Sequence, residues 1–222
     1  MHPSEFRSLL ASEAASAGFE LSGESLDRMA EHNRLLVKWN RAVRLIGSTD
    51  PPVVIRRHIL ESLRLLPFLR EPRGSLLDIG SGNGFPAVPL KCALPDLRVG
   101  LVEPTIRKSA FLTTVIGTLG LTDTEVVRGR VDRAQDLARL GRWDCISMRG
   151  VAAIGAVLAG GTSALRPGGR LLLMVGDAGR AEVLRRIEAP LEITAIHQLP
   201  ETRGSFIVVV GLPHSGLSQT IH

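Results

Sequence analysis

The spacing of apolar residues changes once along the chain, near residue 74. Before that point, apolar residues recur every three or four positions, which is the period of an α-helix. The three helices expected here would begin at Ser4, at Ser22 or Ser25, and at the Asp-Pro-Pro segment 50–52. Serine is a common helix cap, and proline is tolerated in the first helical turn. The N-terminal third is therefore predicted to be entirely helical.

From residue 75 onward, short β-rich runs alternate with helical segments. The expected strands are 75–79, 98–103, 124–129, 143–148, 170–176, 192–198 and 205–211. The helices expected between them are 86–94, 106–120, 131–140, 152–165 and 179–188. Regular alternation predicts a mostly parallel sheet with helices on both faces. The last two strands lie too close in sequence for a crossover helix, so they should pair antiparallel.

This pattern predicts an α/β protein with an appended helical part. Residues 1–72 would form a helical cap packed on the main domain, and residues 73–212 would form a ligand-binding α/β domain. The polar tail 213–222 is expected to be disordered.

Composition and charge narrow the class only slightly. Of the 27 basic residues, 24 are arginines, and the net charge is +5. A basic balance favours a polyanionic partner such as nucleic acid, but a high-GC genome would also enrich arginine. Cys92 and Cys145 form no CxxC pair, so neither a disulfide framework nor a metal site is expected. No signal peptide or membrane-length apolar run is visible, which predicts a cytoplasmic protein.

The stretch SLLDIGSGNGFPAVPL, residues 75–90, follows the first strand directly. Its glycines are spaced GxGxG, and Phe85 stands where a dinucleotide fingerprint would have its third glycine. Asp78 precedes the turn and would repel a pyrophosphate, whereas it would attract the cationic groups of S-adenosylmethionine. Glu103 ends the next strand, where an acid can accept ribose hydroxyls. The combination favours S-adenosylmethionine over a tight turn without a ligand.

Motifs for known methylation chemistries are missing. The chain has no [DNS]PP[YFW] segment of the kind used on exocyclic amines, and no Pro-Cys pair for carbon methylation. Cys92 and Cys145 fall inside a predicted helix and strand, which favours a core position for both. A target with a free lone pair, such as guanine N7, needs no base and is permitted.

Several segments together resemble the bacterial small-subunit ribosomal RNA guanine-N7 methyltransferases of the RsmG (GidB) type. The similarity runs from about residue 20 to residue 212. The segments that carry it are KWNRAVRLIG (38–47), IRRHILES (55–62), LLDIGSGNGFPAVPLK (76–91), LVEPTIRKSAFL (101–112), GRVDR (129–133) and WDCISMRGVA (143–152). The resemblance implies a Rossmann-like class I methyltransferase sheet, mostly parallel with an antiparallel last strand. It also implies that small-subunit ribosomal RNA, or the small subunit, is the partner, and a monomer without metal is expected.

The resemblance also implies a set of site residues. The glycines would face the methionine part of S-adenosylmethionine, Asp78 its amino group, Glu103 the ribose, and Val131 with Asp132 the adenine. The full predicted cofactor set is Asp78, Gly80, Ser81, Gly82, Gly84, Phe85, Glu103, Pro104, Arg130, Val131, Asp132 and Arg149. Arg149 is also the predicted catalytic residue, facing the RNA or the target base. The predicted RNA contacts are Arg56, Arg57, His58, Arg107 and Lys108, although solvated surface charge explains them as well.

Three positions depart from the family pattern. Arg44 begins the segment where the family has Asn-Leu-Thr, Val175 replaces a lysine, and Ser205 lies in the place of an Arg-His-Leu segment. All three are expected on the substrate side. The departures leave two alternatives open: the same fold acting on a small molecule or protein, and a non-catalytic RNA-binding assembly factor.

Overall fold

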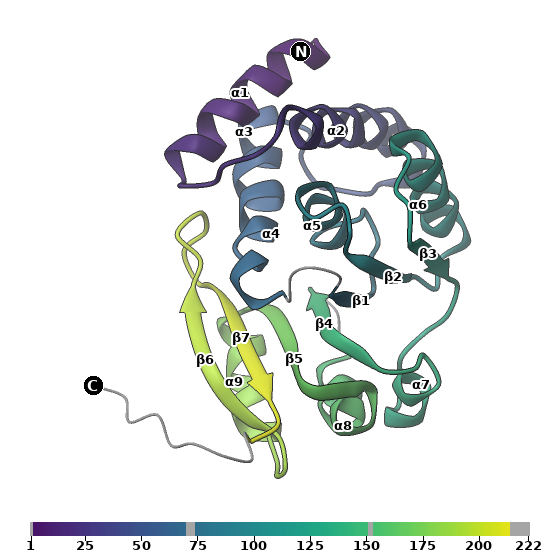
Figure 1. Ribbon diagram of the computed structural model, residues 1–222, viewed down its shortest axis with the longest axis vertical. Coiled ribbons are helices and arrows are strands. Elements are labelled where there is room, and N and C mark those ends of the chain that lie inside the picture. The colour runs from purple at the N-terminus through teal and green to yellow at the C-terminus, as the bar shows by residue number, and fades with distance from the viewer. Residues whose placement is uncertain (1, 70–73, 151–152, 214–222) are drawn as a thin grey trace.

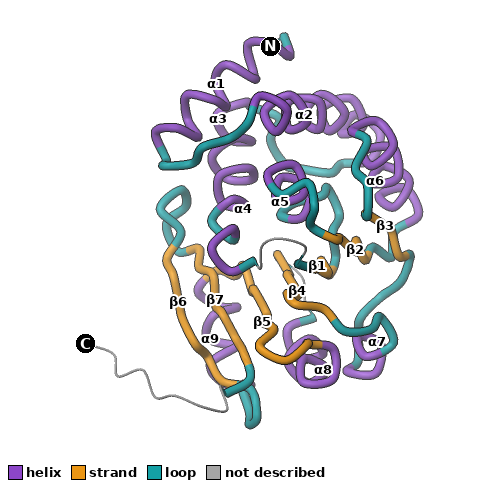
Figure 2. The backbone as a smooth tube through the Cα atoms, in the orientation of Figure 1, coloured by secondary structure: helices purple, strands orange, loops and turns teal. Residues whose placement is uncertain are grey.

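A computed structural model of the chain describes residues 2–69, 74–150 and 153–213. Within these residues the chain forms one seven-stranded sheet, and helices lie against both of its faces (Figure 1). The N-terminal helices gather on one side of the sheet, and the later helices α7 to α9 lie on the other. Figure 2 shows how the strands form one continuous layer between them.

The sheet has the predicted mixed topology. Its strands are β1 (Ser75–Ile79), β2 (Arg98–Val102), β3 (Thr124–Val127), β4 (Trp143–Arg149), β5 (Leu165–Gly176), β6 (Glu192–Gln198) and β7 (Ser205–Gly211). They are arranged in the order β3-β2-β1-β4-β5-β7-β6. The first five strands pair parallel, whereas β7 runs antiparallel to both β5 and β6. The predicted fold class is therefore confirmed, and the order reverses between β1 and β4, where sheets of this type bind ligands.

Alternating side chains give the sheet two different cores. In β1, Leu76 belongs to the cluster under the N-terminal helices, while Leu77 and Ile79 belong to the cluster under α7, α8 and α9. The same alternation holds in β5, where Leu172 faces the first cluster and Leu173 the second. Successive side chains of a strand point to opposite faces, so a strand buried on both sides is apolar almost throughout.

The helices fall at the predicted places, with shifted ends. Before the sheet come α1 (Pro3–Ser16), α2 (Gly23–Val43), α3 (Pro51–Val54), the π-helical turn η1 (Ile55–Leu60), α4 (Glu61–Leu63) and the short 3-10 turn η2 (Leu66–Phe68). Within the sheet region are α5 (Ala87–Ala93), α6 (Ile106–Leu119), α7 (Ala134–Ala138), α8 (Ile154–Ala164) and α9 (Asp177–Arg186).

Two helix starts were open or wrong in the sequence prediction. The second helix is capped by Ser22, whose hydroxyl accepts a hydrogen bond from the Ser25 backbone. The first helix begins earlier than predicted, because His2 rather than Ser4 is the cap and Pro3 occupies the first turn. A histidine ring nitrogen can accept the capping hydrogen bond, which sequence rules based on serine do not anticipate.

The third predicted helix contains an irregularity. Between α3 and α4 the backbone widens into a π-helical turn over the residues Ile-Arg-Arg-His-Ile-Leu. Such turns are rare and occur often at functional sites, because an added residue changes which side chains and carbonyls face outward.

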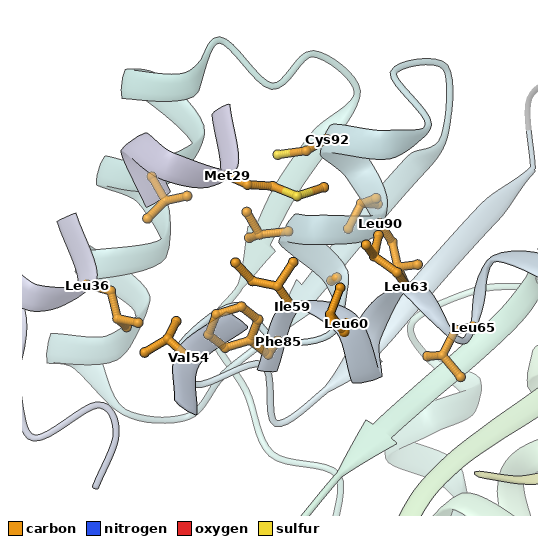
Figure 3. Packing of buried hydrophobic residues seen from close by; sticks show 14 of the residues in the cluster. Met29, Leu36, Val54, Ile59, Leu60, Leu63, Leu65, Phe85, Leu90 and Cys92 are labelled. Carbon is orange, nitrogen blue, oxygen red and sulfur yellow. The ribbon is translucent and has the colours of Figure 1, made fainter. Parts of the chain in front are cut away.

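The N-terminal helices share their core with the sheet. The buried residues on their inner side pack with the β1 residue Leu76 and the β2 residue Leu101 in one cluster. Figure 3 shows Phe85, from the turn after β1, lying among Val54, Ile59 and Leu60 of the third helical segment. We therefore expect residues 1–72 to act as a cap that cannot be separated from the rest. The tail prediction for residues 213–222 lies, except for its first residue, outside the described part of the chain.

Candidate cofactor and substrate site

The turn after β1 needs its three glycines. Gly80, Gly82 and Gly84 have φ values of +73°, +50° and +89°. Residues that carry a Cβ rarely adopt such positive φ values. The amides of Gly80 and Ser81 donate to the carbonyl of Val102 at 2.8 and 3.0 Å, which fastens the turn to the end of β2. At Gly84 there is also no room, because an added Cβ would lie 2.8 Å from Val88 Cγ2.

Glu103 joins the turn to the neighbouring strand. Its Oε2 accepts from the Gly82 amide at 3.0 Å, and its Oε1 accepts from the Thr105 amide at 2.8 Å. The residue is buried, with 4% of its surface exposed. Because each carboxylate oxygen has two lone pairs, Glu103 retains acceptor capacity toward the space above the turn.

A cavity of about 510 Å³ opens at the carboxyl ends of β1 and β2. Among the predicted cofactor residues, those that line it are Gly80, Gly82, Phe85, Glu103, Pro104, Arg130, Val131, Asp132 and Arg149. The lining residues outside the predicted cofactor and RNA sets are Leu45, Ile79, Asn83, Val102, Thr105, Gly129, Gly150 and Ala153. Asn83 lies inside the quoted glycine stretch, and its amide donates to the Leu45 carbonyl at 3.3 Å. Ile79, Val102, Thr105, Gly129 and Gly150 adjoin predicted residues near strand ends, so strand-end position was the available signal for them. Leu45 lies in the segment that departs from the family pattern, and Ala153 had no such signal.

Asp78 lies beneath the turn rather than in the cavity lining. Its Oδ1 accepts from the Ser147 hydroxyl of the adjacent strand at 2.6 Å, and its Oδ2 has no hydrogen-bond partner among the described residues. Burial raises the pKa of Asp78 to about 7, and the hydrogen bond from Ser147 opposes this rise. The site therefore holds a buried carboxyl that a nearby cation would ionise. Ser81 and Gly84, also predicted to bind, shape the turn without lining the cavity.

Two histidines enclose the Phe85 ring. His58 stacks on it with ring centroids 5.0 Å apart and 18° between the planes, and His32 lies 5.0 Å from it on a tilt of 48°. The His32 Nε2 atom lies 3.0 Å from the Asn83 carbonyl, to which it donates. Burial lowers the pKa of each histidine to about 4, so both are neutral at physiological pH. The glycine turn thus rests on a neutral aromatic stack, of which His58 also lines the cavity.

Arg149 ends β4 and lies on the cavity wall. Its Nη2 donates to Glu61 Oε2 and to the backbone oxygen of Arg57, each at 2.5 Å. Its Nη1 has no partner within the described part of the chain. Burial lowers the pKa of Arg149 and raises the pKa of Glu61, and in each case the charge of the partner acts in the opposite direction. The predicted catalytic arginine is thus held by the π-helical turn and by an acid that the sequence analysis did not identify.

The predicted RNA contacts have different surroundings. Arg56 is paired with Glu13 of α1 at 2.7 Å, and Arg57 exposes its side chain while its carbonyl faces Arg149. Lys108 lines the cavity, and the neighbouring Arg107 is exposed outside it. Arg130 pairs with Asp132 at 3.1 Å at the cavity rim. Two of the five predicted contacts, His58 and Lys108, therefore border the cavity.

Arg44, Val175 and Ser205 do not line the cavity, whereas Leu45, from the departing segment 44–46, does. Val175 is buried, and the α9 residue Gly179 lies so close that an added Cβ there would be 2.9 Å from the Val175 Cβ. Ser205 is paired with Gly176 inside the sheet. Val175 does not face the cavity, because the alternation of β5 turns its side chain toward α9. Arg44 is exposed at the end of α2 and has a φ of +20°.

The described residues contain no group of three or more His, Cys, Asp or Glu side chains arranged to hold a metal ion. No helix in the described ranges is long and apolar enough to cross a membrane. Cys92 and Cys145 are both buried, as the core prediction required.

Comparison with solved structures supports the fold. The chain is similar to fibrillarin from Aeropyrum pernix in complex with natively bound S-adenosyl-L-methionine, with a TM-score of 0.57 and 19% identity, over 70% of this chain and 75% of that one. At 19% identity, this similarity supports the fold and nothing further.

Sequence relatives identify the family. The chain is 36% identical over 171 residues to the ribosomal RNA small subunit methyltransferase G of Desulfitobacterium hafniense, covering 77% of this chain and 71% of the relative. It is 33% identical over 198 residues to the protein of the same name from Halorhodospira halophila, covering 89% and 92%. The family model for GidB, rRNA small subunit methyltransferase G, matches residues 25–200. The chain therefore belongs to the GidB family of small-subunit ribosomal RNA methyltransferases.

Proposed function

We propose that this protein transfers a methyl group from S-adenosylmethionine to N7 of one guanine in small-subunit ribosomal RNA, in a loop near the decoding site. The observation that carries the proposal is the cavity at the carboxyl ends of β1 and β2, formed by the glycine turn and Glu103 in a chain of this family. Its volume falls within the range of small-ligand sites, roughly 300–1,000 Å³.

The residues present fit the cofactor. Glu103 has acceptor capacity for two ribose hydroxyls, and Gly129, Val131 and Ala153 offer small or apolar surface for an adenine ring. Asp78 supplies a buried carboxyl whose Oδ2 has no partner in the described part of the chain, which suits a cationic ligand. When bound there, S-adenosylmethionine would supply an electrophilic methyl group on a sulfonium.

The chain's own residues would contribute orientation and exclusion of water. N7 of guanine carries a lone pair and no proton, so the transfer requires placement of the base rather than a general base. His58 at the cavity wall is neutral, and it would not need to act as a base, because N7 of the target carries no proton. Arg149 would direct its guanidinium hydrogens to acceptors on the base edge, where guanine presents O6 next to N7. Lys108 at the rim would contact phosphate.

The test is methyl transfer from labelled S-adenosylmethionine to small subunits purified from cells that lack this modification. We expect a single N7-methylguanine, mapped by strand cleavage at that base. Naked ribosomal RNA assayed in parallel would show whether the assembled subunit is needed. Label in a small-molecule or protein fraction, with none in RNA, would instead favour a changed substrate. Tight subunit binding without cofactor affinity would favour an assembly factor.

The remaining expectations follow from this activity. A protein that modifies ribosomal RNA would act in the cytoplasm. The residues that line the cavity at the ends of β1 and β2 all come from one chain, so we propose that the protein works as a monomer. Light scattering of the purified protein would test the second point.

A further inference from the structure

We propose that Glu61 is the positioning residue of the methyl transfer: it fixes the Arg149 guanidinium in the orientation that the substrate base requires. The proposal rests on the function proposed above and adds to it a residue from the N-terminal cap. Glu61 does not line the cavity, so it would act only through Arg149.

The first support is geometry. Two acceptors converge on the same nitrogen, Arg149 Nη2: the Glu61 carboxylate and the Arg57 carbonyl, both at 2.5 Å. Both belong to the irregular part of the third helix, where the π-helical turn meets α4. Because Nη2 is engaged by two acceptors on the cap side, the planar guanidinium is held in one orientation, and Nη1 is buried without a hydrogen-bond partner among the described contacts.

The second support is burial. Glu61 has only 3% of its side chain exposed, and Arg149 has 22%. A buried ion pair is a weak source of stability, because desolvation offsets most of the attraction between the charges. An apolar pair of the same volume would hold the cap on the sheet at least as well. The charge pair is explained better by the orientation that it imposes on a group at the cavity wall.

The third support is the backbone after Arg149. The next residue, Gly150, has a φ of +60° and lines the cavity, and an added Cβ there would meet no heavy atom within 4 Å. The long arginine side chain therefore takes its direction from its hydrogen-bond acceptors. Without Glu61 it would have several rotamers, and the base would lose a fixed partner.

The experiment compares Glu61→Gln with Glu13→Gln. The control removes the acid from another arginine pair, Arg56 with Glu13 at 2.7 Å, which lies away from the cavity. We expect Glu61→Gln to lower kcat on small subunits about 10- to 100-fold, with the Kd for S-adenosylmethionine changed less than about twofold. Glu61→Asp should recover part of the loss, and Glu13→Gln should leave kcat unchanged.

A double-mutant cycle separates positioning from a general loss of structure. In an Arg149→Ala background, Glu61→Gln should lower kcat no further, because the group that it orients is gone. An equal loss in both backgrounds, or an unchanged kcat in Glu61→Gln alone, would overturn the proposal. If Glu61→Gln proves too unstable, the apolar pair Glu61→Leu with Arg149→Met keeps the fold, and it should be as inactive as Arg149→Met alone.

A readout without turnover keeps this proposal distinct from the proposed function. Nitrogen NMR of the guanidinium should show separate, slowly exchanging Nη signals for Arg149 in the wild type and a single averaged signal in Glu61→Gln. An averaged signal in the wild type would refute the positioning role even if the enzyme is active. Absence of methyl transfer by the wild type, with separate signals, would instead refute the function.

Discussion

Replacing Asp78 with asparagine should make the ligand-free protein more stable and at the same time weaken cofactor binding. Asp78 is buried beneath the glycine turn, and its pKa is raised from the ordinary 3.8 to about 7. The folded state therefore binds a proton more tightly than the unfolded state does. The stability that this proton contributes is fully present below pH 3.8 and is lost as the pH rises through about 7.

The size of the effect follows from the two pKa values. The difference between 3.8 and about 7 corresponds to about 4 kcal/mol of unfolding free energy above pH 8. Asparagine avoids this cost and can still accept the hydrogen bond from Ser147. The side-chain NH2 group of asparagine would, however, take the place of Oδ2, where no hydrogen-bond partner lies among the described residues. Leaving this buried donor unpaired costs about 1–3 kcal/mol. We expect a net gain of about 1–3 kcal/mol at pH 8.

The assay is urea unfolding without cofactor at several pH values between 5 and 9. In thermal unfolding, a gain of this size would raise the Tm of a chain of this length by several degrees. Asp96→Asn, which removes an exposed carboxylate, is the control variant. Calorimetry should show that Asp78→Asn weakens S-adenosylmethionine binding about tenfold or more, because a neutral amide does not attract a cation.

Two results would refute this reasoning. If the advantage of Asp78→Asn over the wild type does not grow between pH 5 and pH 8, the burial of the carboxyl is not what destabilises the protein. If the variant binds S-adenosylmethionine as the wild type does, the carboxylate has no role toward the cofactor, and the turn must be reinterpreted.

Three further substitutions test the site and its supports. Gly84→Ala should lower the unfolding free energy by about 2–4 kcal/mol in urea, because the new Cβ meets Val88 at a positive φ; an unchanged midpoint would contradict the tight turn. Arg44→Asn should raise that free energy by about 0.5–1 kcal/mol, since asparagine tolerates the φ of +20° better, and a loss would show that the arginine has contacts of its own. The pKa of His32 is lowered to about 4, so the unfolding free energy should fall by up to about 3 kcal/mol as the pH drops from 6.5 toward 4. In acid unfolding curves, His32→Gln should make this pH dependence weaker.

The alternation of strands and helices was readable from the sequence because each strand is buried on both faces. Apolar runs such as Leu171 to Met174 can fill two cores only in a sheet covered on both sides. The glycine turn was equally readable, since a positive φ at Gly80, Gly82 and Gly84 leaves little choice of residue. These features are local, so one sequence suffices to predict them.

Features that join distant segments were not predictable in this way. The pair of Arg149 and Glu61 connects positions 88 residues apart, and the π-helical turn that brings them together leaves no mark in the apolar period. The stack around Phe85 draws its two histidines from different helices. The orientation of Val175 was not predictable either, because strand alternation gives two faces without saying which one lies toward the cavity.

The position of Phe85 has a consequence for how this protein can evolve. The ring belongs to the glycine turn, yet it lies inside the core of the N-terminal helices, with Val54 and Ile59 beside it in Figure 3. The helical cap and the turn therefore share one core, and we expect that exchanging the cap for another would disturb the turn. We expect the effects of substitutions on the inner surface of the cap and in the turn to depend on one another.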